Sequence, residues 1–472
     1  MNCAALMTLS QVAQWLPTAE LMGDGGVELA RVHTDTRSIE AGDLFVALKG
    51  DTFDGNQFLP QAKAKGAVAA ICESREALVQ SGLHGLVVTD SRQALASLAS
   101  AWRAQFTLPL IAVTGSNGKT TVTQMIASIL RVYAPEAMLA TEGNFNNDIG
   151  VPLTLLRLRP HHTIAVVELG MNHPGEIARL AGLAKPTIAL VNNAQREHME
   201  FMATVEAVAL ENGAVFGLLP ATGVAVFPQD DAFSGLWHSL TAPRPCITFA
   251  DGQPGALVDV ATAAAHWLNG AWRIDVATPA GPLRCELHIA GRHNVKNALA
   301  AIACALAAGV PVAVIAQGLE KFEPVRGRSK TVVGSVGGHQ FTLIDDTYNA
   351  NPDSVKAAID VLASLPAPRL LVLGDMGEVG DSGPQFHAEA GEHARAAGIE
   401  GLCTLGDVSE RASVAFGGGS HFSDVDTLNT TLLEAIKNYN SVLVKGSRFM
   451  RMERVVNAIA AGPQNSKEAA CC

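Results

Sequence analysis

Residues 111–123 carry the side chains and glycines that a nucleotide phosphate site needs. The segment reads IAVTGSNGKTTVT, an apolar run followed by a glycine-containing loop, Lys119 and Thr120. Glycines let backbone amides approach phosphate oxygens, a lysine neutralises the terminal phosphates, and a threonine hydroxyl can ligate Mg²⁺. Val113 stands where the usual loop has its first glycine, so the segment predicts a shortened phosphate loop. Its expected phosphate-binding residues are Gly115, Ser116, Asn117, Gly118, Lys119, Thr120 and Thr121.

Two polar residues beyond this loop are candidate metal ligands. Glu168 closes the apolar run TIAVVE, and His198 lies just beyond TIALVNN. Ligands of parallel α/β sheets bind at the carboxyl ends of strands, so both side chains could reach a Mg²⁺ ion held by Thr120. Each residue also has an ordinary alternative, because charged residues often end strands and a loop histidine is usually solvated. Their combination with the phosphate loop favours the metal interpretation.

The elements that must position these residues follow an α/β rhythm. Short apolar runs alternate with helical stretches up to residue 106, from 110 to 193, and again after 340. Continuous apolar runs fit strands buried on both faces of a parallel sheet, whereas residues 227–290 are richer in short strands and turns. We expect three α/β domains and a frayed tail. The expected domain boundaries are 1–106, 107–325 and 326–462, with the tail at 463–472.

Composition and charge exclude several classes of function. The 472 residues carry a formal charge of −11 and no run of Lys and Arg, which argues against nucleic-acid binding. No stretch reaches the roughly 18 charge-free apolar residues needed to span a bilayer. Residues 1–22 also lack the basic leading region of a signal peptide. We therefore expect a cytoplasmic protein that does not insert into membranes.

Several motifs together resemble the Mur ligase family in order and spacing, over essentially the whole chain. They are TGSNGKTT, TEGNFNNDIGVP, VVELGMNHPGEI, GRHNVKNALAA and DDTYNANPDS. Within the family, TYNANPDS, LGDMGEVG and VLVKGSRFMRME resemble the member that adds D-alanyl-D-alanine. The N-terminal stretch TDTRSIEAGDLFVALKGDTFDGNQF is similar to the family's UDP-binding segment.

The resemblance implies an ATP-dependent ligase of peptidoglycan synthesis that joins D-alanyl-D-alanine to UDP-N-acetylmuramoyl-tripeptide. A substrate carboxylate would attack the γ-phosphate of ATP, giving an acyl phosphate and ADP, and the incoming amine would then displace phosphate. ATP and Mg²⁺ are the implied cofactors. The implied fold has a central P-loop domain with a parallel sheet, an N-terminal UDP-binding α/β domain and a C-terminal Rossmann-like α/β domain. We expect a monomer.

The resemblance also assigns roles to individual residues. Lys119, Glu168 and His198 would be catalytic, and Thr120, Glu168 and His198 would surround the metal. Asn294 and Asn297 would approach adenine, Arg328 the phosphates, and Asp346 the ribose or phosphates. The UDP-precursor side would comprise Thr34, Asp35, Thr36, Arg37, Ser38, Lys49, Gly50, Asn144, Asn146 and Asn147. The acceptor side would comprise Asn349, Asn351, Asp353 and Ser354.

Some positions depart from the family pattern. Many Mur ligases carry a lysine in an AKGEI-like stretch, and its carbamylated form supports a second Mg²⁺. Here Asn212 stands at that position, so either Glu211 or another carboxylate substitutes, or the second ion is held more weakly. Asp353 follows Pro352 where the diaminopimelate-adding ligase usually has arginine, which favours a dipeptide acceptor. The tripeptide could end in lysine or diaminopimelate.

Two alternatives remain open. One is another ligase of the superfamily, such as a folylpolyglutamate synthase, which lacks the UDP-binding domain that residues 1–106 resemble. The other is a nucleotide-binding relative that has lost catalysis, for which Asn212 is the best argument. This second alternative is opposed by the retention of Lys119, Glu168, His198, Arg328 and Asp346.

Overall fold

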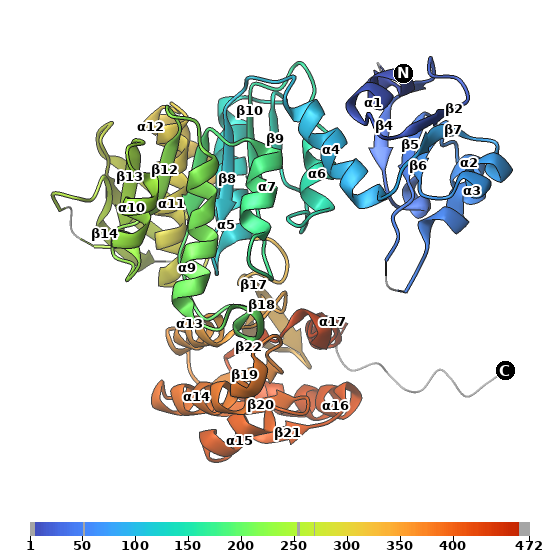
Figure 1. Cartoon of the computed structure of the whole chain (residues 1–472). Coiled ribbons are helices and arrows are strands. Elements are labelled where there is room, and N and C mark those ends of the chain that lie inside the picture. Colours follow the sequence, from blue (N-terminus) through green and yellow to red (C-terminus); the bar gives the residue numbers. More distant parts are fainter. Residues whose placement is uncertain (1–4, 51, 253–254, 269, 462–472) are drawn as a thin grey trace, which may run out of the picture.

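Three sheets organise the chain, one after another along the sequence (Figure 1). The computed structural model describes residues 5–50, 52–252, 255–268 and 270–461. Helices cover each sheet, so the protein is an α/β protein with three domains, as the sequence predicts. The tail predicted at 463–472 lies outside the described residues. Within the described part, no helix is long and apolar enough to cross a membrane.

The N-terminal sheet has the strand order β2-β7-β6-β5-β4, in which β4 to β7 are parallel and β2 is antiparallel to β7. Its strands are β2 (Glu20–Met22), β4 (Arg31–His33), β5 (Asp43–Val46), β6 (Ala69–Cys72) and β7 (His84–Val87). A smaller sheet pairs β1 (Met7–Thr8) with β3 (Glu28–Leu29). The helices are α1 (Leu9–Trp15), α2 (Leu59–Ala64), α3 (Arg75–Ser81) and α4 (Ser91–Arg103).

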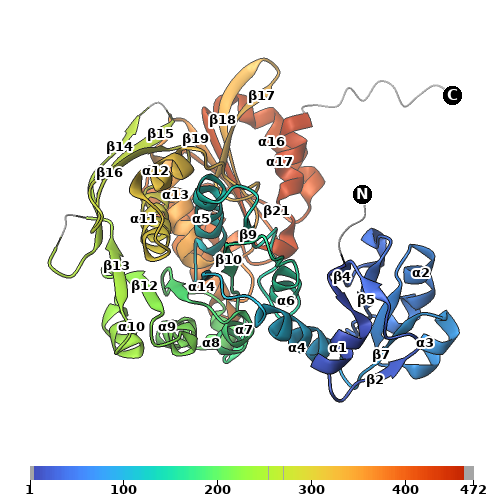
Figure 2. The same cartoon turned by 90° about the horizontal axis from the view of Figure 1, so that it is seen from above.

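Helix α4 joins this domain to the next one. The Arg103 side chain at its end is buried, and it donates hydrogen bonds to the carbonyls of Ala184, Lys185 and Phe106. Trp102 Nε1 donates to the carbonyl of Leu158. These bonds satisfy a buried guanidinium with main-chain oxygens, and they fasten the N-terminal domain beside the central one (Figure 2).

The central sheet has nine strands in the order β16-β15-β14-β13-β12-β11-β8-β10-β9. The parallel part comprises β8 (Leu110–Thr114), β9 (Met138–Ala140), β10 (Ile164–Glu168), β11 (Ile188–Val191), β12 (Val224–Pro228), β13 (Cys246–Ala250) and β14 (Val260–Leu268). β15 (Ala271–Ala277) and β16 (Leu283–Leu287) add an antiparallel edge. The strand-rich region expected at 227–290 therefore extends the central sheet.

Both faces of this sheet are buried, which explains the continuous apolar runs. Alternate residues of β8 face opposite sides: Ile111 and Val113 belong to one hydrophobic cluster, and Leu110 and Ala112 to the other. The first cluster packs on α5 (Lys119–Tyr133), α11 (Arg292–Ala307) and α12 (Val312–Glu320). The second packs on α6 (Gly150–Leu155), α7 (Glu176–Ala184), α9 (Val205–Gly213) and α10 (Ser234–Thr241), and α8 (Met199–Met202) lies nearby.

The C-terminal sheet has the order β17-β18-β22-β19-β20-β21, parallel except for β17. Its strands are β17 (Lys330–Val336), β18 (His339–Asp346), β19 (Arg369–Gly374), β20 (Gly401–Leu405), β21 (Ser420–Phe422) and β22 (Ser441–Lys445). Helices α13 (Pro352–Ala363), α14 (Gly383–Ala396) and α15 (Glu410–Phe416) cover one face, and α16 (Val425–Ala435) and α17 (Glu453–Ala461) cover the other.

Candidate active site

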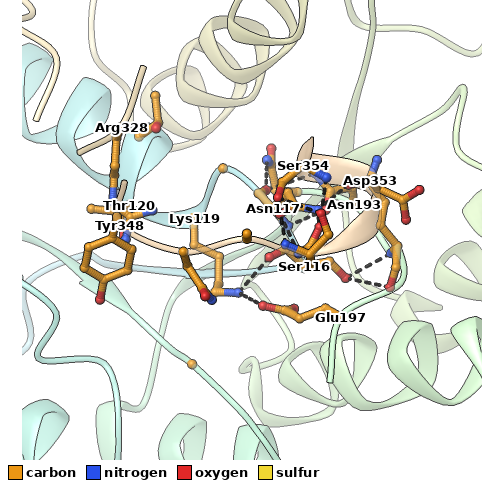
Figure 3. Close-up of a pocket in the computed structure, with 18 of the residues that line it drawn as sticks. Ser116, Asn117, Lys119, Thr120, Asn193, Glu197, Arg328, Tyr348, Asp353 and Ser354 are labelled. Carbon is orange, nitrogen blue, oxygen red and sulfur yellow. Dashed lines mark hydrogen bonds and ion pairs between the residues drawn. The ribbon is translucent and has the colours of Figure 1, made fainter. Parts of the chain in front are cut away.

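A cavity of about 560 Å³ lies between the carboxyl ends of the central strands and the C-terminal domain. The phosphate loop forms one wall, and the loop between β18 and α13 forms the facing wall (Figure 3). The site residues expected from the sequence that line it are Ser116, Asn117, Gly118, Lys119, Thr120, Thr121, Asn146, Asn147, Glu168, His198, Asn294, Asn297, Arg328, Asp346, Asn349, Asn351, Asp353 and Ser354. Gly115, which is buried, and Asn144, which is exposed, do not line the cavity.

Two glycines give the phosphate loop its shape. Gly115 and Gly118 have φ angles of +126° and +80°, in the region that glycine tolerates best. A Cβ atom on Gly118 would lie 2.5 Å from Oδ1 of Asn297, and one on Gly115 would lie 2.9 Å from the backbone nitrogen of Asn192. The loop therefore turns into α5 with no space for larger residues.

Asn212 supports the loop from behind. It is fully buried, and its Oδ1 accepts hydrogen bonds from the backbone nitrogen of Gly115 (2.9 Å) and from the hydroxyl of Thr114. The neighbouring Glu211 accepts from the backbone nitrogens of Gly175 and Ile177, both at 2.8 Å, and so caps the start of α7. Because its carboxylate is used there, Glu211 does not supply the negative charge that a carbamylated lysine at position 212 would carry.

Lys119 has a carboxylate partner that the sequence reasoning did not identify. Its Nζ lies 2.8 Å from Oε1 of Glu197 and also donates to the carbonyls of Gly115 and Ser116 (Figure 3). Both side chains are largely buried, with 13% and 10% of their surfaces exposed. In the sequence, Glu197 could have been found from its position directly before His198, which is a candidate metal ligand.

Glu168 and Thr120 have the chemistry of a hard cation site. Thr120 Oγ1 donates to Oε1 of Glu168 at 3.0 Å, and Asn146 Nδ2 donates to the same oxygen at 2.7 Å. The second oxygen of Glu168 is buried and has no hydrogen-bond partner. Mg²⁺ commonly binds one or two carboxylates together with substrate phosphates, so these oxygens fit it. Over the described ranges, no three His, Cys, Asp or Glu side chains are grouped to hold a metal by themselves.

His198 lies at the interface with the C-terminal domain. Its Nδ1 lies 2.6 Å from Oε2 of Glu378, and its Nε2 lies 3.4 Å from Oε1 of Glu197. Burial would lower the pKa of His198, but hydrogen bonds and charge from the two carboxylates outweigh it and raise the pKa to about 9. A histidine protonated at neutral pH has no lone pair for a metal. In this arrangement His198 is an ion-pair partner, and its metal role stays a prediction.

The C-terminal wall carries two further side chains that sequence reasoning missed. Lys445, which is buried, lies 2.6 Å from Oδ2 of Asp346 and donates to the carbonyl of Asn349. Burial raises the pKa of Asp346, but this ion pair outweighs it and keeps the pKa low. The guanidinium of Arg328 lies 3.9 Å above the ring of Tyr348. In the sequence, Lys445 is marked only by its position at the end of the predicted strand SVLVK.

Asn294 and Asn297 connect α11 to the phosphate loop. Asn297 Oδ1 accepts from Nδ2 of Asn192 at 2.9 Å, and Asn297 Nδ2 donates to Oδ1 of Asn294 at 2.9 Å. Because the Asn297 amide lies against Gly118, it is at the phosphate end of the cavity. The predicted contact of both residues with adenine remains a prediction.

Residues 34–38, 49 and 50, which are expected to bind the uridine diphosphate, lie on the N-terminal domain and outside this cavity. Residues 34–38 follow β4, and Lys49 and Gly50 follow β5, so both groups lie beyond the carboxyl ends of neighbouring parallel strands. Asp35 accepts hydrogen bonds from the side chain and backbone of Arg37, which lower the pKa of Asp35 to about 2. The Arg37 side chain is 87% exposed even though it is paired with Asp35.

Comparison with known proteins identifies the family. The family models for the Mur ligase middle domain, the Mur ligase glutamate ligase domain and the Mur ligase catalytic domain match residues 113–305, 327–448 and 28–103. UDP-N-acetylmuramoyl-tripeptide–D-alanyl-D-alanine ligase from Escherichia coli is 41% identical over 96% of this chain and 98% of its own length. The chain belongs to the Mur ligase family. The ligase of the same name from Bacillus subtilis is 34% identical over 92% of this chain and 93% of its own length.

Solved structures of other Mur ligases have the same fold. MurF from Acinetobacter baumannii is 34% identical, with a TM-score of 0.87 over 96% of this Mur ligase and 98% of that chain. MurF from Thermotoga maritima in complex with ADP is 26% identical, with a TM-score of 0.77 over 91% of this chain and 97% of that chain. The three-domain α/β architecture of this Mur ligase is therefore shared along nearly the whole chain.

Proposed function

We propose that this Mur ligase joins D-alanyl-D-alanine to UDP-N-acetylmuramoyl-tripeptide at the expense of ATP. The observation that carries the proposal is that one cavity contains both the phosphate loop and the TYNANPDS loop. Relatives that carry this activity in their names match the chain almost end to end, including its N-terminal domain. This N-terminal match favours a Mur ligase acting on a UDP precursor over a folylpolyglutamate synthase.

In the first step, a precursor carboxylate attacks the γ-phosphate, which passes to that carboxylate as ADP leaves. Phosphoryl transfer depends on positioning and charge neutralisation more than on a protein nucleophile. The backbone amides of the loop would hold the phosphates, and Lys119 would exchange Glu197 for phosphate oxygens. Thr120 and Glu168 would hold Mg²⁺, which supplies positive charge to the phosphate oxygens when bound. Arg328 and Asp346 would hold the nucleotide from the C-terminal side.

In the second step, the amine of the dipeptide attacks the acyl phosphate, and phosphate leaves. Asn349, Asn351 and Ser354 of the loop before and at the start of α13 would receive the dipeptide. The Asp353 carboxylate is already hydrogen-bonded to Arg196, so its part is to place this loop. Residues 34–38, Lys49 and Gly50 would bind the uridine diphosphate, with Asn146 and Asn147 on the sugar and peptide side.

We also propose that the enzyme is a cytoplasmic monomer with domains bounded near residues 106 and 325. Cys72, Cys285, Cys304 and Cys403 are buried free thiols, which suits a reducing compartment. The cavity takes both its walls from one chain, so a second copy is not required to complete it. Analytical ultracentrifugation with and without substrates tests the monomer.

The decisive experiment measures phosphate release with ATP, Mg²⁺, UDP-linked tripeptide and D-alanyl-D-alanine, omitting one component at a time. Sustained release only with the complete mixture, accompanied by a pentapeptide product in mass spectrometry, is expected. Release with glutamate or diaminopimelate in place of the dipeptide would assign another acceptor. No release in any mixture, by a protein that still binds ATP, would favour a non-catalytic role.

A further inference from the structure

Arg196 connects the central domain to the first turn of α13. Its backbone nitrogen donates to Oδ2 of Asp353 at 2.8 Å, and its Nε and Nη2 donate to Oδ1 at 3.1 and 2.8 Å. Its Nη1 donates to Oε2 of Glu389 at 2.8 Å, and its guanidinium lies 5.1 Å from the ring centre of Phe386. One side chain of the central domain thus binds two carboxylates and an aromatic ring of the C-terminal domain.

The Arg196–Asp353 pair differs from an ordinary surface ion pair. The side chains of Arg196 and Asp353 are only 27% and 24% exposed. Four hydrogen bonds from one arginine fix the carboxylate in position and orientation, whereas a mobile surface pair fixes neither. The position of α13 relative to the central domain is therefore set at this contact.

A second contact ties the same loop to the phosphate loop. Asn351, which caps α13, donates from Nδ2 to Oδ1 of Asn117 at 2.9 Å. Asn117 in turn donates to the side chain of Gln195 at 2.6 Å, and the backbone nitrogen of Gln195 donates to Ser116 Oγ at 2.9 Å. Figure 3 shows Asn117, Asp353 and Ser354 gathered on one side of the cavity.

Residues 195–197 therefore contact both walls of the cavity. Gln195 bonds to the phosphate loop, Arg196 to the acceptor-side loop, and Glu197 to Lys119. A change in the phosphate loop on nucleotide binding would be passed through three consecutive residues to the loop that faces the acceptor. Among these three contacts, that of Arg196 is with the C-terminal domain.

We propose that Arg196 is a positioning residue that holds the acceptor-side loop over the phosphate loop while the acyl phosphate exists. The inference rests on the proposed function. Attack by the dipeptide amine forms the C–N bond, breaks the C–O bond to phosphate, and releases phosphate and the amine proton. Attack by water breaks the same bond but regenerates the carboxylate, so ATP is consumed with no product. By holding the acceptor-side loop in place, Arg196 keeps water away from the acyl phosphate and so favours attack by the amine.

The test compares phosphate released with pentapeptide formed, for Arg196→Ala and for Asp353→Asn. Wild type should release about one phosphate per product because each ligation consumes one ATP. Both variants should release severalfold more phosphate per product and show a raised KM for D-alanyl-D-alanine, with the KM for ATP little changed. Arg196→Asp combined with Asp353→Arg should bring the ratio back toward the wild-type value. A general loss of folding would not be repaired by this exchange.

Arg273→Ala is the matched control, because Arg273 forms an exposed ion pair with Glu286 on the β15–β16 edge. It should leave the ratio and both KM values unchanged. A ratio near one in folded Arg196→Ala and Asp353→Asn enzymes that ligate more slowly would overturn the inference and leave the proposed function intact. Wild-type enzyme that forms no pentapeptide would instead overturn the proposed function itself.

Discussion

At the residue scale, the cavity contains charged side chains that are paired with one another, and a substrate can replace one member of each pair. Lys119 is paired with Glu197, Asp346 with Lys445, and one oxygen of Glu168 has no hydrogen-bond partner. Buried charges are costly unless paired, so each pairing offsets part of the cost of placing these side chains in the cavity. Phosphate oxygens and a cation can then replace or complete the partners.

Lys119→Ala should lower kcat by at least about 10² because it removes a charge that neutralises the transferred phosphoryl group. Binding of the UDP-linked tripeptide should change less than twofold, since residues 34–38, 49 and 50, which are expected to bind its uridine diphosphate, lie on another domain. Phosphate release and calorimetric titration measure the two quantities. Lys321→Ala, at an exposed position after α12, is the control. Equal loss of precursor binding in a folded Lys119→Ala enzyme would contradict the separation of the pockets.

Asn212→Ala should destabilise the fold by about 1–3 kcal/mol because it leaves the buried Gly115 N–H and Thr114 hydroxyl without their acceptor. The apparent affinity for ATP should also fall, since Gly115 begins the phosphate loop. Urea unfolding of wild type and variant, read as a shift in midpoint at constant slope, measures the first effect. An unchanged midpoint would mean that other groups or water satisfy these donors.

At the scale of elements, the strand, loop and helix around residues 110–133 were predictable because their signals are local. Apolar runs, glycines and a following helix pattern need no knowledge of the rest of the fold. β17 was not predicted, because it is an edge strand with Val332 and Val333 exposed and a glycine within it. Arg196, Glu197, Tyr348 and Lys445 were missed because their roles come from partners far along the sequence, such as Asp353, which is 157 positions from Arg196.

The turn into α5 allows the cost of a positive φ angle to be separated from the cost of a steric clash. Gly118 and Gly309 have similar positive φ angles, +80° and +76°, but a Cβ on Gly309 would meet nothing within 4 Å. Alanine at either position costs about 1–2 kcal/mol of backbone strain. Gly118→Ala should in addition displace Asn297 and raise the KM for ATP at least tenfold, whereas Gly309→Ala should leave it unchanged. Similar ATP kinetics in both variants would show that the loop yields to the added methyl group.

At the scale of the whole molecule, the C-terminal domain meets the central domain through polar contacts such as Asn351–Asn117, Asp353–Arg196 and Glu378–His198, together with packing of Ala290 and Trp267 on its core. The net free energy of each hydrogen bond or ion pair is modest even where it fixes geometry, because water competes for the same groups when the domains separate. An interface of this kind can separate and re-form during a catalytic cycle, which a large apolar interface does not do readily.

Glu378→Gln should therefore shift the molecule toward an open arrangement. The change removes one of the two carboxylates that raise the pKa of His198, and it replaces an ion pair across the interface with a contact to a neutral amide. We expect a larger radius of gyration in X-ray scattering than for wild type, and recovery when ATP and the UDP-linked tripeptide are added, because the ligands bridge the two domains. Glu400→Gln, which breaks an ion pair with Arg369 inside the C-terminal domain, should not change the radius. If Glu378→Gln and wild type scatter identically in both conditions, the His198–Glu378 contact does not control closure, and the contacts of Arg196 and Asn117 hold the domains together without it.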